Sequence, residues 1–247
     1  MTRYYLDTEF DDTGTAINLI SIGLVCEDGR ELYLGNSECN HDTCNDWVKA
    51  NVLPQLPKRD AVIVDTRPDV YGITPIDRFK GSIWRTRVEI RDAIDAFIID
   101  DGQPVEIWAY FASCDWVVFY QLFGEMVNLP KRFPRFVRDL KTYALDIGYT
   151  GKFKVLVPDE GHHDALCDAR WNRNVHRTLI EMHNRAYIVL VDALLADLND
   201  RAGFDVDSDV RDMIRPDWIK IVEGSMPFGQ TNYEKGGLLD QKHRSEP

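Results

Sequence analysis

The pattern of hydrophobic positions predicts an α/β chain that opens with strands. Residues 4–10 form an aromatic and aliphatic run, and residues 16–27 form a long apolar run typical of a core strand. Asp28-Gly29 predicts a tight hairpin between that run and a third strand at residues 31–34. The chain is therefore expected to begin with an antiparallel meander.

After the meander, the pattern changes to helical spacing interrupted by one buried strand. Apolar residues recur at helical spacing in four segments: residues 46–53, 86–99, 116–123 and 136–146. Residues 105–111 read as a strand that is buried on both sides. From residue 161 a helix is expected to run to about residue 183, followed by a separate amphipathic helix at residues 188–198.

This pattern predicts one α/β domain over residues 1–183 and a helical addition over residues 184–247. The polar tail from Gly236 is expected to be disordered. Residues 58–82 combine a short apolar piece with scattered Pro, Gly and Asp, and are either an ordered insertion or a loop excursion beside a site.

Composition narrows the class of protein. A chain of 247 residues that is 44% hydrophobic can bury a sizeable core. No export signal or bilayer-length apolar run is present, so a cytoplasmic protein with reduced thiols is expected from its five cysteines. The net charge of −12 argues against a broad basic surface for polyanions. One basic cluster is either a solvated helix face or a phosphate contact: Lys131, Arg132, Arg135, Arg138 and Lys141.

Two carboxylates are set into the first hydrophobic run. Because successive side chains of a strand point to opposite faces, Asp7 and Glu9 share one face. Burying both without partners is unfavourable, and a divalent cation is one of the few partners that offsets their repulsion. The alternative is an exposed edge strand with two solvated acids.

Three further residues suit a metal site. Asp115 lies where the strand at residues 105–111 gives way to a helix, and taken alone it is better explained as a helix N-cap than as a metal ligand. His163 precedes the last long helix, and Asp168 lies on its first turns. Asp164 is one turn before Asp168 on the same face, so periodicity leaves open which of the two is a ligand.

Together, Asp7-Thr8-Glu9, Asp115, and His163 with Asp168 resemble the three motifs of the DEDD 3'-5' exonucleases. His163 lies five residues before Asp168, which resembles the histidine branch, DEDDh, of that family. Within it, the sequence is most similar to the polyadenylate-specific 3'-exoribonuclease AS group, and more distantly to ribonuclease T and oligoribonuclease. The resemblance covers residues 1–183 and implies an RNase H-like fold, α/β, with a mixed central sheet flanked by helices.

The resemblance also implies a mechanism. Asp7, Glu9, Asp115 and Asp168 would hold two Mg²⁺ or Mn²⁺ ions, which prefer oxygen ligands. His163 would act as the general base. The expected activity is release of 5'-mononucleotides from the 3' ends of single-stranded RNA, with DNA 3' ends as the alternative substrate.

Residues beside the motifs could hold the terminal nucleotide. Phe10, Ile22 and Trp116 are candidates for stacking or apolar contacts to unpaired bases, with core packing as the alternative for each. The backbone near Thr8 and the carboxylate of Glu9 are candidates for reading the 2'-hydroxyl. Members of the ribonuclease T type act as homodimers, so the resemblance makes a homodimer plausible.

Two alternative interpretations of the sequence do not involve an exonuclease. Cys39, His41 and Cys44, with Cys26, could form a structural zinc module, although paired Cys-x-x-Cys motifs are missing. A catalytically silent nucleic-acid-binding module is the second, and the complete set of five motif residues argues against it.

Overall fold

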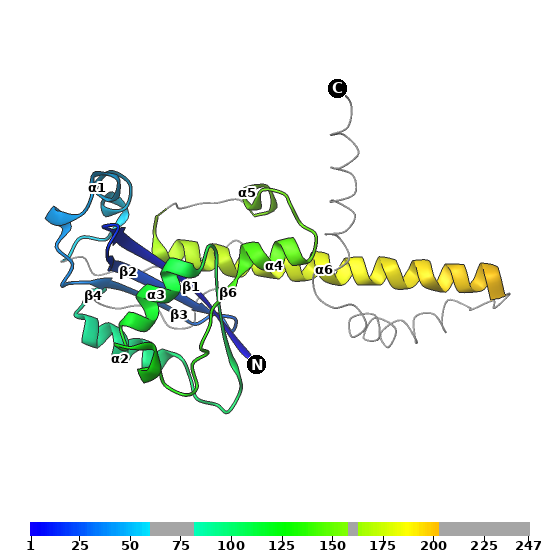
Figure 1. The fold of residues 1–247 in the computed structure, drawn as a ribbon, viewed down its shortest axis with the longest axis horizontal. Helices are drawn as coiled ribbons and strands as arrows, with labels where there is room; N and C mark the ends of the chain where they lie inside the picture. The colour runs from blue at the N-terminus through cyan, green and yellow to red at the C-terminus, as the bar shows by residue number, and fades with distance from the viewer. Residues whose placement is uncertain (60–81, 158–162, 203–247) are drawn as a thin grey trace, which may run out of the picture. The chain divides into compact units, whose positions relative to one another are not determined.

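The computed structural model describes residues 1–59, 82–157 and 163–202, with side chains through residue 197 (Figure 1). A sheet of six strands has the order β4-β3-β2-β1-β5-β6, with β1 next to its centre. The strands are β1 (Thr2–Asp12), β2 (Ile17–Cys26), β3 (Glu31–Asn36), β4 (Trp84–Arg85), β5 (Val105–Ala109) and β6 (Arg138–Asp139).

The predicted meander is confirmed, because β1 pairs antiparallel with β2 and β2 pairs antiparallel with β3. The other pairs are parallel: β1 with β5, β5 with β6, and β3 with β4. Gly29, with a φ of 93°, makes the hairpin between β2 and β3, where a residue without a Cβ adopts that conformation readily. The mixed central sheet expected from the sequence is therefore present.

Helices account for most of the remaining described residues. The α-helices are α1 (Asp46–Asn51), α2 (Arg87–Phe97), α3 (Ser113–Gln121), α4 (Leu140–Asp146), α5 (Phe153–Leu156) and α6 (Ala165–Ala202). Short 3₁₀ turns are at His41–Thr43, Leu53–Gln55 and Met126–Asn128. Thr86 begins α2 with a capping box, in which its side chain and that of Glu89 satisfy each other's backbone N–H groups.

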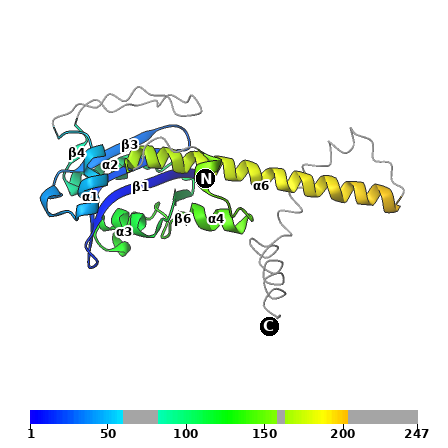
Figure 2. The same ribbon diagram turned by 90° about the horizontal axis from the view of Figure 1, so that it is seen from above.

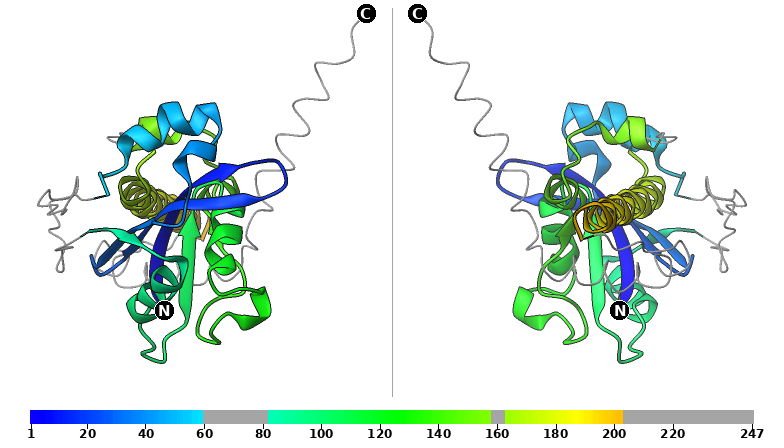
Figure 3. Two further views of the ribbon diagram at one scale, coloured as in Figure 1. Left: turned by 90° about the vertical axis from the view of Figure 1, so that its left-hand side faces the viewer. Right: turned by 90° about the vertical axis from the view of Figure 1, so that its right-hand side faces the viewer.

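Helices cover both faces of the sheet (Figure 3). On one face, Ile90, Ile94 and Phe119 of α2 and α3 pack with Leu6 and Leu24 of the strands in the main hydrophobic core. On the other face, the first turns of α6 lie along β1, and Asn172 Nδ2 donates a hydrogen bond of 2.9 Å to Leu6 O (Figure 2). The strands are thus buried on both faces, as the continuous apolar run predicted.

Two predicted elements were wrong in detail. The helix expected at residues 136–146 begins only at Leu140, because Arg138 and Asp139 pair with Trp108 and Ala109 as the edge strand β6. The break expected near residue 183 is absent, and α6 continues through it. Residues 184–187 contain neither Gly nor Pro, so nothing in that segment ends the helix.

The chain divides into two compact units. The first comprises Met1–Lys141 and Phe153–His176 and contains the whole sheet. The second comprises Thr142–Lys152 and the residues from Arg177 onward. Most of the segment predicted as an insertion at residues 58–82 and the predicted disordered tail lie outside the described residues.

Membrane insertion has no support in the described part of the chain, where none of the helices combines the length and the apolar character needed to cross a bilayer.

Members of the basic cluster serve the fold. Arg132 pairs with Asp95 at 2.6 Å, and Arg138 pairs with Glu106 at 2.7 Å. Arg135 donates to the carbonyl of Met126. For these three residues, the structural interpretation is therefore favoured over a phosphate contact.

Gly23 lets α6 approach the sheet closely. It pairs with Asp7 across β1 and β2, and a Cβ built on it would overlap the carbonyl group of Ala165 and lie 2.7 Å from the Cα of Leu166. These are backbone atoms, which cannot swing aside as a flexible side chain can. The absence of a side chain at Gly23 therefore fixes how near the start of α6 comes to Asp7.

We expect Gly23→Ala to lower the free energy of unfolding by roughly 2 to 4 kcal/mol, because the added methyl group must push α6 away. Urea denaturation measures this loss. Ser21→Ala is the matched control: it lies two residues away on the same strand, and its buried hydroxyl has no hydrogen-bond partner among the described residues. Removing that hydroxyl should change the free energy of unfolding little. An equal loss of unfolding free energy in both variants would contradict the close approach of α6 to Gly23.

Candidate metal centre

Three carboxylates converge where β1 faces the start of α6. Asp7 and Glu9 project from the same face of β1, and Asp168 lies in the first turns of α6. One carboxylate oxygen from each of the three lies within 4.8 Å of the others. Glu9 is buried, and Asp7 and Asp168 are half-buried. A group of this size and donor type can hold a hard divalent cation.

Asp115 approaches the cluster through Thr8, the residue between Asp7 and Glu9. Its Oδ1 accepts hydrogen bonds from Thr8 N at 2.9 Å and from Thr8 Oγ1 at 2.6 Å. Asp115 lies inside α3, whose N-cap is Ala112, so the N-cap interpretation is wrong. The Asp115 carboxylate is held toward β1 by these two hydrogen bonds.

The structure separates the roles of Asp164 and Asp168. Asp164 Oδ1 accepts a hydrogen bond of 2.9 Å from Cys167 N, as an N-cap of α6 would, and its Oδ2 accepts one of 3.1 Å from the hydroxyl of Tyr33. Asp168, one turn later, belongs to the cluster. Its Oδ2 also accepts a hydrogen bond of 3.1 Å from the backbone N–H of His163.

Burial and mutual repulsion shift the pKa values of the cluster upward. Burial, and then the charge of Asp115, raise the pKa of Asp7 well above its ordinary value. Burial, and then Asp168, raise the pKa of Glu9 to about 8. Burial raises the pKa of Asp115 to about 6, although its hydrogen bonds from Thr8 oppose the shift. The cluster is therefore poised to exchange protons for a cation.

Two residues in or near the motif segments have a strained backbone conformation. Phe111 and His163, with φ of 54° and 64°, are the two non-glycine residues with positive φ in the described part of the chain. Such conformations are costly for residues with a Cβ, and they are common at functional sites. Phe111 is four residues before Asp115, is 64% exposed, and lies against the ring of Tyr110 with centroids 4.3 Å apart. An exposed aromatic ring in a strained conformation is not explained by core packing.

The helix α1 brings an aromatic ring against His163. Asp11, which follows Asp7 and Glu9 at alternate positions of β1, accepts two hydrogen bonds from Asn45, through the backbone N and the side-chain Nδ2. Asn45 in turn caps α1 by accepting from Val48 N. Trp47 of that helix contacts the ring of His163 edge-on, with centroids 5.0 Å apart.

The residues predicted to contact a base are mostly packed inside. Ile22 is fully buried in the main core, and Trp116 is 7% exposed and stacks on Phe119. Phe10 is half-buried and packs against the same core. Thr8 is buried and bonded to Asp115, so it positions that carboxylate.

The residues of the competing zinc interpretation are not gathered into a site. Among the described residues, the one group of three or more potential ligands close enough to share an ion is Asp7, Glu9 and Asp168. Cys39 and Cys44 lie near each other, and burial raises the pKa of both thiols, but no third potential ligand joins them within reach of a shared ion in the described part of the chain.

Several supporting residues were not recognised in the sequence. Arg170 forms a two-pronged ion pair with Glu31, at 2.9 and 2.6 Å, that joins α6 to β3. Burial, and then the charge of Asp164, raise the pKa of Tyr33, whose hydroxyl therefore remains a donor to that carboxylate. Gly23 carried one signal, because a glycine inside an apolar strand often indicates a close backbone approach.

Comparison with known proteins identifies relatives of this chain. Residues 2–180 match the family described as the 3'-5' exoribonuclease Rv2179c-like domain. The relatives named 3'-5' exoribonuclease Rv2179c and 3'-5' exoribonuclease MT2234.1, from two strains of Mycobacterium tuberculosis, are each 36% identical over 169 residues, which is 68% of this chain and 87% of theirs. A solved structure of S. pombe Pop2p in an Mg²⁺- and Mn²⁺-bound form is 11% identical, over 70% of this chain and 81% of that one, with a TM-score of 0.37. The last likeness is too distant to carry an argument.

The raised pKa of Glu9 predicts how stability depends on pH without metal. Because the folded protein holds this proton up to about pH 8 and the unfolded chain releases it near 4.5, stability should fall as pH rises between these values. We expect Glu9→Gln to reduce that fall by roughly 1 to 3 kcal/mol, measured by urea denaturation in a chelator. The exposed Glu125→Gln is the control, and parallel pH dependence in wild type and Glu9→Gln would contradict the assignment.

Proposed function

The chain belongs to the family of Rv2179c-like 3'-5' exoribonuclease domains, and we propose that it removes nucleotides from the 3' ends of single-stranded RNA by metal-dependent hydrolysis. The observation that carries this proposal is the approach of carboxylate oxygens of Asp7, Glu9 and Asp168 to within 4.8 Å of one another. Such an approach between acids is unfavourable without a cation, and in this family it suits phosphodiester cleavage.

The donor set fits Mg²⁺ or Mn²⁺, with two ions per site. Asp7, Glu9 and Asp168 would supply hard oxygen ligands to the ions, with Asp7 as the central ligand, because its carboxylate feels the charges of Asp115, Asp168 and Glu9. Asp115, held by Thr8, completes the set. When bound, such ions activate a water molecule and stabilise the negative charge that develops on the scissile phosphate.

His163 is the general base in this proposal. Its ordinary pKa near 6.5 suits removal of a proton from the attacking water. Two observations support this role: the backbone N–H of His163 donates to Asp168, and the His163 ring contacts Trp47, although the ring is not part of the group of three carboxylates within 4.8 Å. This arrangement supports placing the chain in the histidine branch of the DEDD exonucleases, close to the polyadenylate-specific exoribonuclease AS group.

The product of this reaction is a 5'-mononucleotide. Water adds to the phosphorus of the terminal phosphodiester, and the bond from that phosphorus to the 3' oxygen of the preceding nucleotide breaks, so the phosphate stays on the 5' carbon of the released nucleotide. For the terminal base, Phe10 stays a proposed contact because it is half-buried at the same end of β1 as Glu9. The exposed ring of Phe111 is a stronger candidate for stacking than the buried Ile22 and Trp116.

RNA is favoured over DNA as the substrate because the family and both relatives carry the name exoribonuclease. A silent binding module is disfavoured, since a protein that only bound nucleic acid would gain nothing from a costly cluster of acids that repels phosphate.

Asp7→Asn should lower the rate of 3' nucleotide release by about three orders of magnitude, because it removes the carboxylate at the centre of the cluster. The measurement is digestion of a 5'-labelled single-stranded RNA with Mn²⁺. Asp12→Asn is the matched control, because Asp12 is exposed at the end of the same strand and its bond from Gly14 N survives the change. Equal rates in the two variants would exclude Asp7 from the chemistry.

His163→Asn should cut turnover by about two to four orders of magnitude and leave Mn²⁺ affinity nearly unchanged. Asn is chosen because it tolerates the positive φ at this position, so the backbone bond to Asp168 is kept. Single-turnover kinetics and a Mn²⁺ titration of the same preparation separate the two effects. Full activity in this variant would rule out the general-base role.

Matched single strands of RNA and DNA with the same base sequence distinguish the two substrate classes. We expect nucleotides to be released from the RNA 3' end at least about tenfold faster, a difference that corresponds to one good contact to the 2'-hydroxyl. Faster digestion of the DNA strand would make the DNA-directed alternative the better one.

A further inference from the structure

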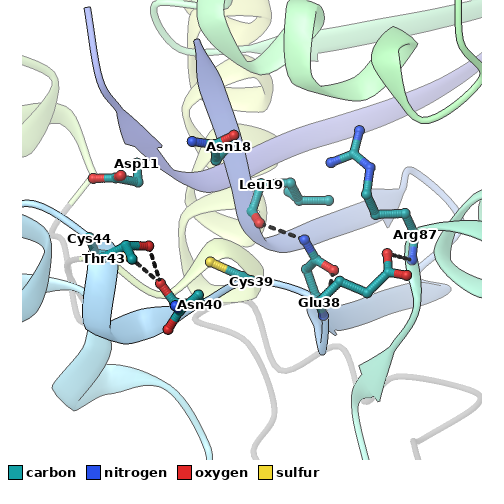
Figure 4. A pocket seen from close by; sticks show the side chains of 10 residues that line it. Asp11, Asn18, Leu19, Glu38, Cys39, Asn40, Thr43, Cys44 and Arg87 are labelled. Atoms are coloured by element: carbon teal, nitrogen blue, oxygen red, sulfur yellow. Dashed lines mark hydrogen bonds between the residues drawn. The ribbon is translucent and has the colours of Figure 1, made fainter.

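A pocket lies beyond the carboxylate cluster, where β1 ends and β2 begins. Its volume is about 290 Å³, near the lower end for pockets that bind small molecules. Figure 4 shows Asp11 on one side of it and Arg87 on the other, with Cys39 between them. The lining side chains come from β1, β2, the end of β3, the segment after β3 and the start of α2, and are Asp11, Asn18, Leu19, Asn36, Glu38, Cys39, Asn40, Thr43, Cys44 and Arg87.

The pocket continues the line of acids along β1. The register between β1 and β2 shifts between Glu9 and Phe10, but Asp11 still accepts from Asn45, which caps α1, and Trp47 of α1 contacts His163. Asp11 therefore lies on the same side of the sheet as Asp7, about 13 Å away at the usual rise of a strand. A stacked single strand of nucleic acid covers about 13 Å in about four nucleotides, and an extended strand covers it in fewer. A substrate strand that runs along β1 from the cluster would therefore reach the pocket beyond its terminal two nucleotides.

Several polar groups of the pocket have hydrogen-bonding capacity left over. Among the described residues, the guanidinium of Arg87 makes no ion pair and only one long contact, 3.5 Å to Gln121 O, and the side chain of Asn18 makes no hydrogen bond. Glu38 uses Oε2 to accept from Arg87 N, and Asp11 uses Oδ1 to accept from Asn45, so each has a second carboxylate oxygen. In Figure 4 the guanidinium of Arg87 and the carboxylate of Glu38 thus lie on one side of the pocket, and the carboxylate of Asp11 lies on the other.

This mixture matches the chemistry of a ribonucleotide. A guanidinium binds a phosphate in a charge-assisted pair. Carboxylate oxygens accept hydrogen bonds and donate none, so they suit the hydroxyl groups of a ribose and would gain nothing from a deoxyribose at the 2' position. The amide of Asn18 can pair with either the edge of a base or the sugar.

We propose that this pocket binds an upstream ribonucleotide of the substrate strand, beyond the terminal two, with Arg87 on its phosphate and the carboxylates of Asp11 and Glu38 near its 2'-hydroxyl. The proposal rests on the exoribonuclease function above and extends it. It makes the pocket a second point at which RNA is distinguished from DNA, separate from the metal centre.

The test compares substrates that can and cannot reach the pocket. The ratio of kcat/KM for a hexanucleotide to that for a dinucleotide with the same 3' end is measured for the full chain with Mn²⁺. We expect Arg87→Gln to lower this ratio about tenfold and Asn18→Ala to lower it about threefold. Arg91→Gln, one turn later on α2 and paired with Asp92, is the matched control and should leave the ratio unchanged.

Single 2'-deoxy substitutions in the hexanucleotide locate the contact. The third, fourth and fifth positions from the 3' end are each substituted in turn, and in wild type one of these substitutions should lower kcat/KM about fivefold. In Glu38→Ala, the same substitution should lower kcat/KM by less than fivefold.

Two results would overturn the proposal that this pocket binds an upstream ribonucleotide. If wild type digests both RNAs but the ratio stays unchanged in both Arg87→Gln and Asn18→Ala, the pocket is not part of the substrate path and the proposed function stands. If wild type digests neither RNA, the proposed function fails, and the pocket fails with it.

Discussion

Electrostatic repulsion among carboxylates on one face of a buried strand is the constraint on which the rest of this structure depends. β1 carries Asp7 and Glu9 into the middle of a sheet that is covered on both faces, and α6 brings Asp168 to the same place. The cost appears directly as raised pKa values, to about 8 for Glu9. A bound divalent cation would offset this cost, which is why the cluster supports the metal centre proposed above.

The surrounding contacts hold the acids in place against this repulsion. Gly23 allows the backbone of α6 to press against β2, and the ion pair between Arg170 and Glu31 ties the same helix to β3. Thr8 fixes Asp115 with two hydrogen bonds. Because the acids are positioned from three elements, with Asp7 and Glu9 on β1, Asp115 on α3 and Asp168 on α6, the packing of α3 and α6 against the sheet holds them together against their repulsion.

Much of the fold and the cluster could be predicted from the sequence, because they follow from local patterns. The alternation of side chains along a strand predicted that Asp7 and Glu9 share one face, and runs of apolar residues predicted the meander and β5. The continuous course of α6 and the short strand β6 could not be predicted, since both depend on pairing and packing with distant residues. The choice between Asp164 and Asp168 likewise needed the position of Tyr33, which lies on another strand. The burial of Ile22 and Trp116 shows the same limit, because flanking a motif says nothing about which face a side chain occupies in the packed core.

The central claim is that the acids of β1 and α6 form one two-ion metal centre. The most direct measurement is the number of Mn²⁺ ions bound per chain, counted by electron paramagnetic resonance during titration of the purified full-length protein near pH 8. Two ions per chain in wild type, with the spectral broadening of a coupled pair, and loss of that coupled signal in Glu9→Gln are the predicted results. No Mn²⁺ bound at millimolar concentration, or an unchanged coupled signal in Glu9→Gln, would contradict the claim.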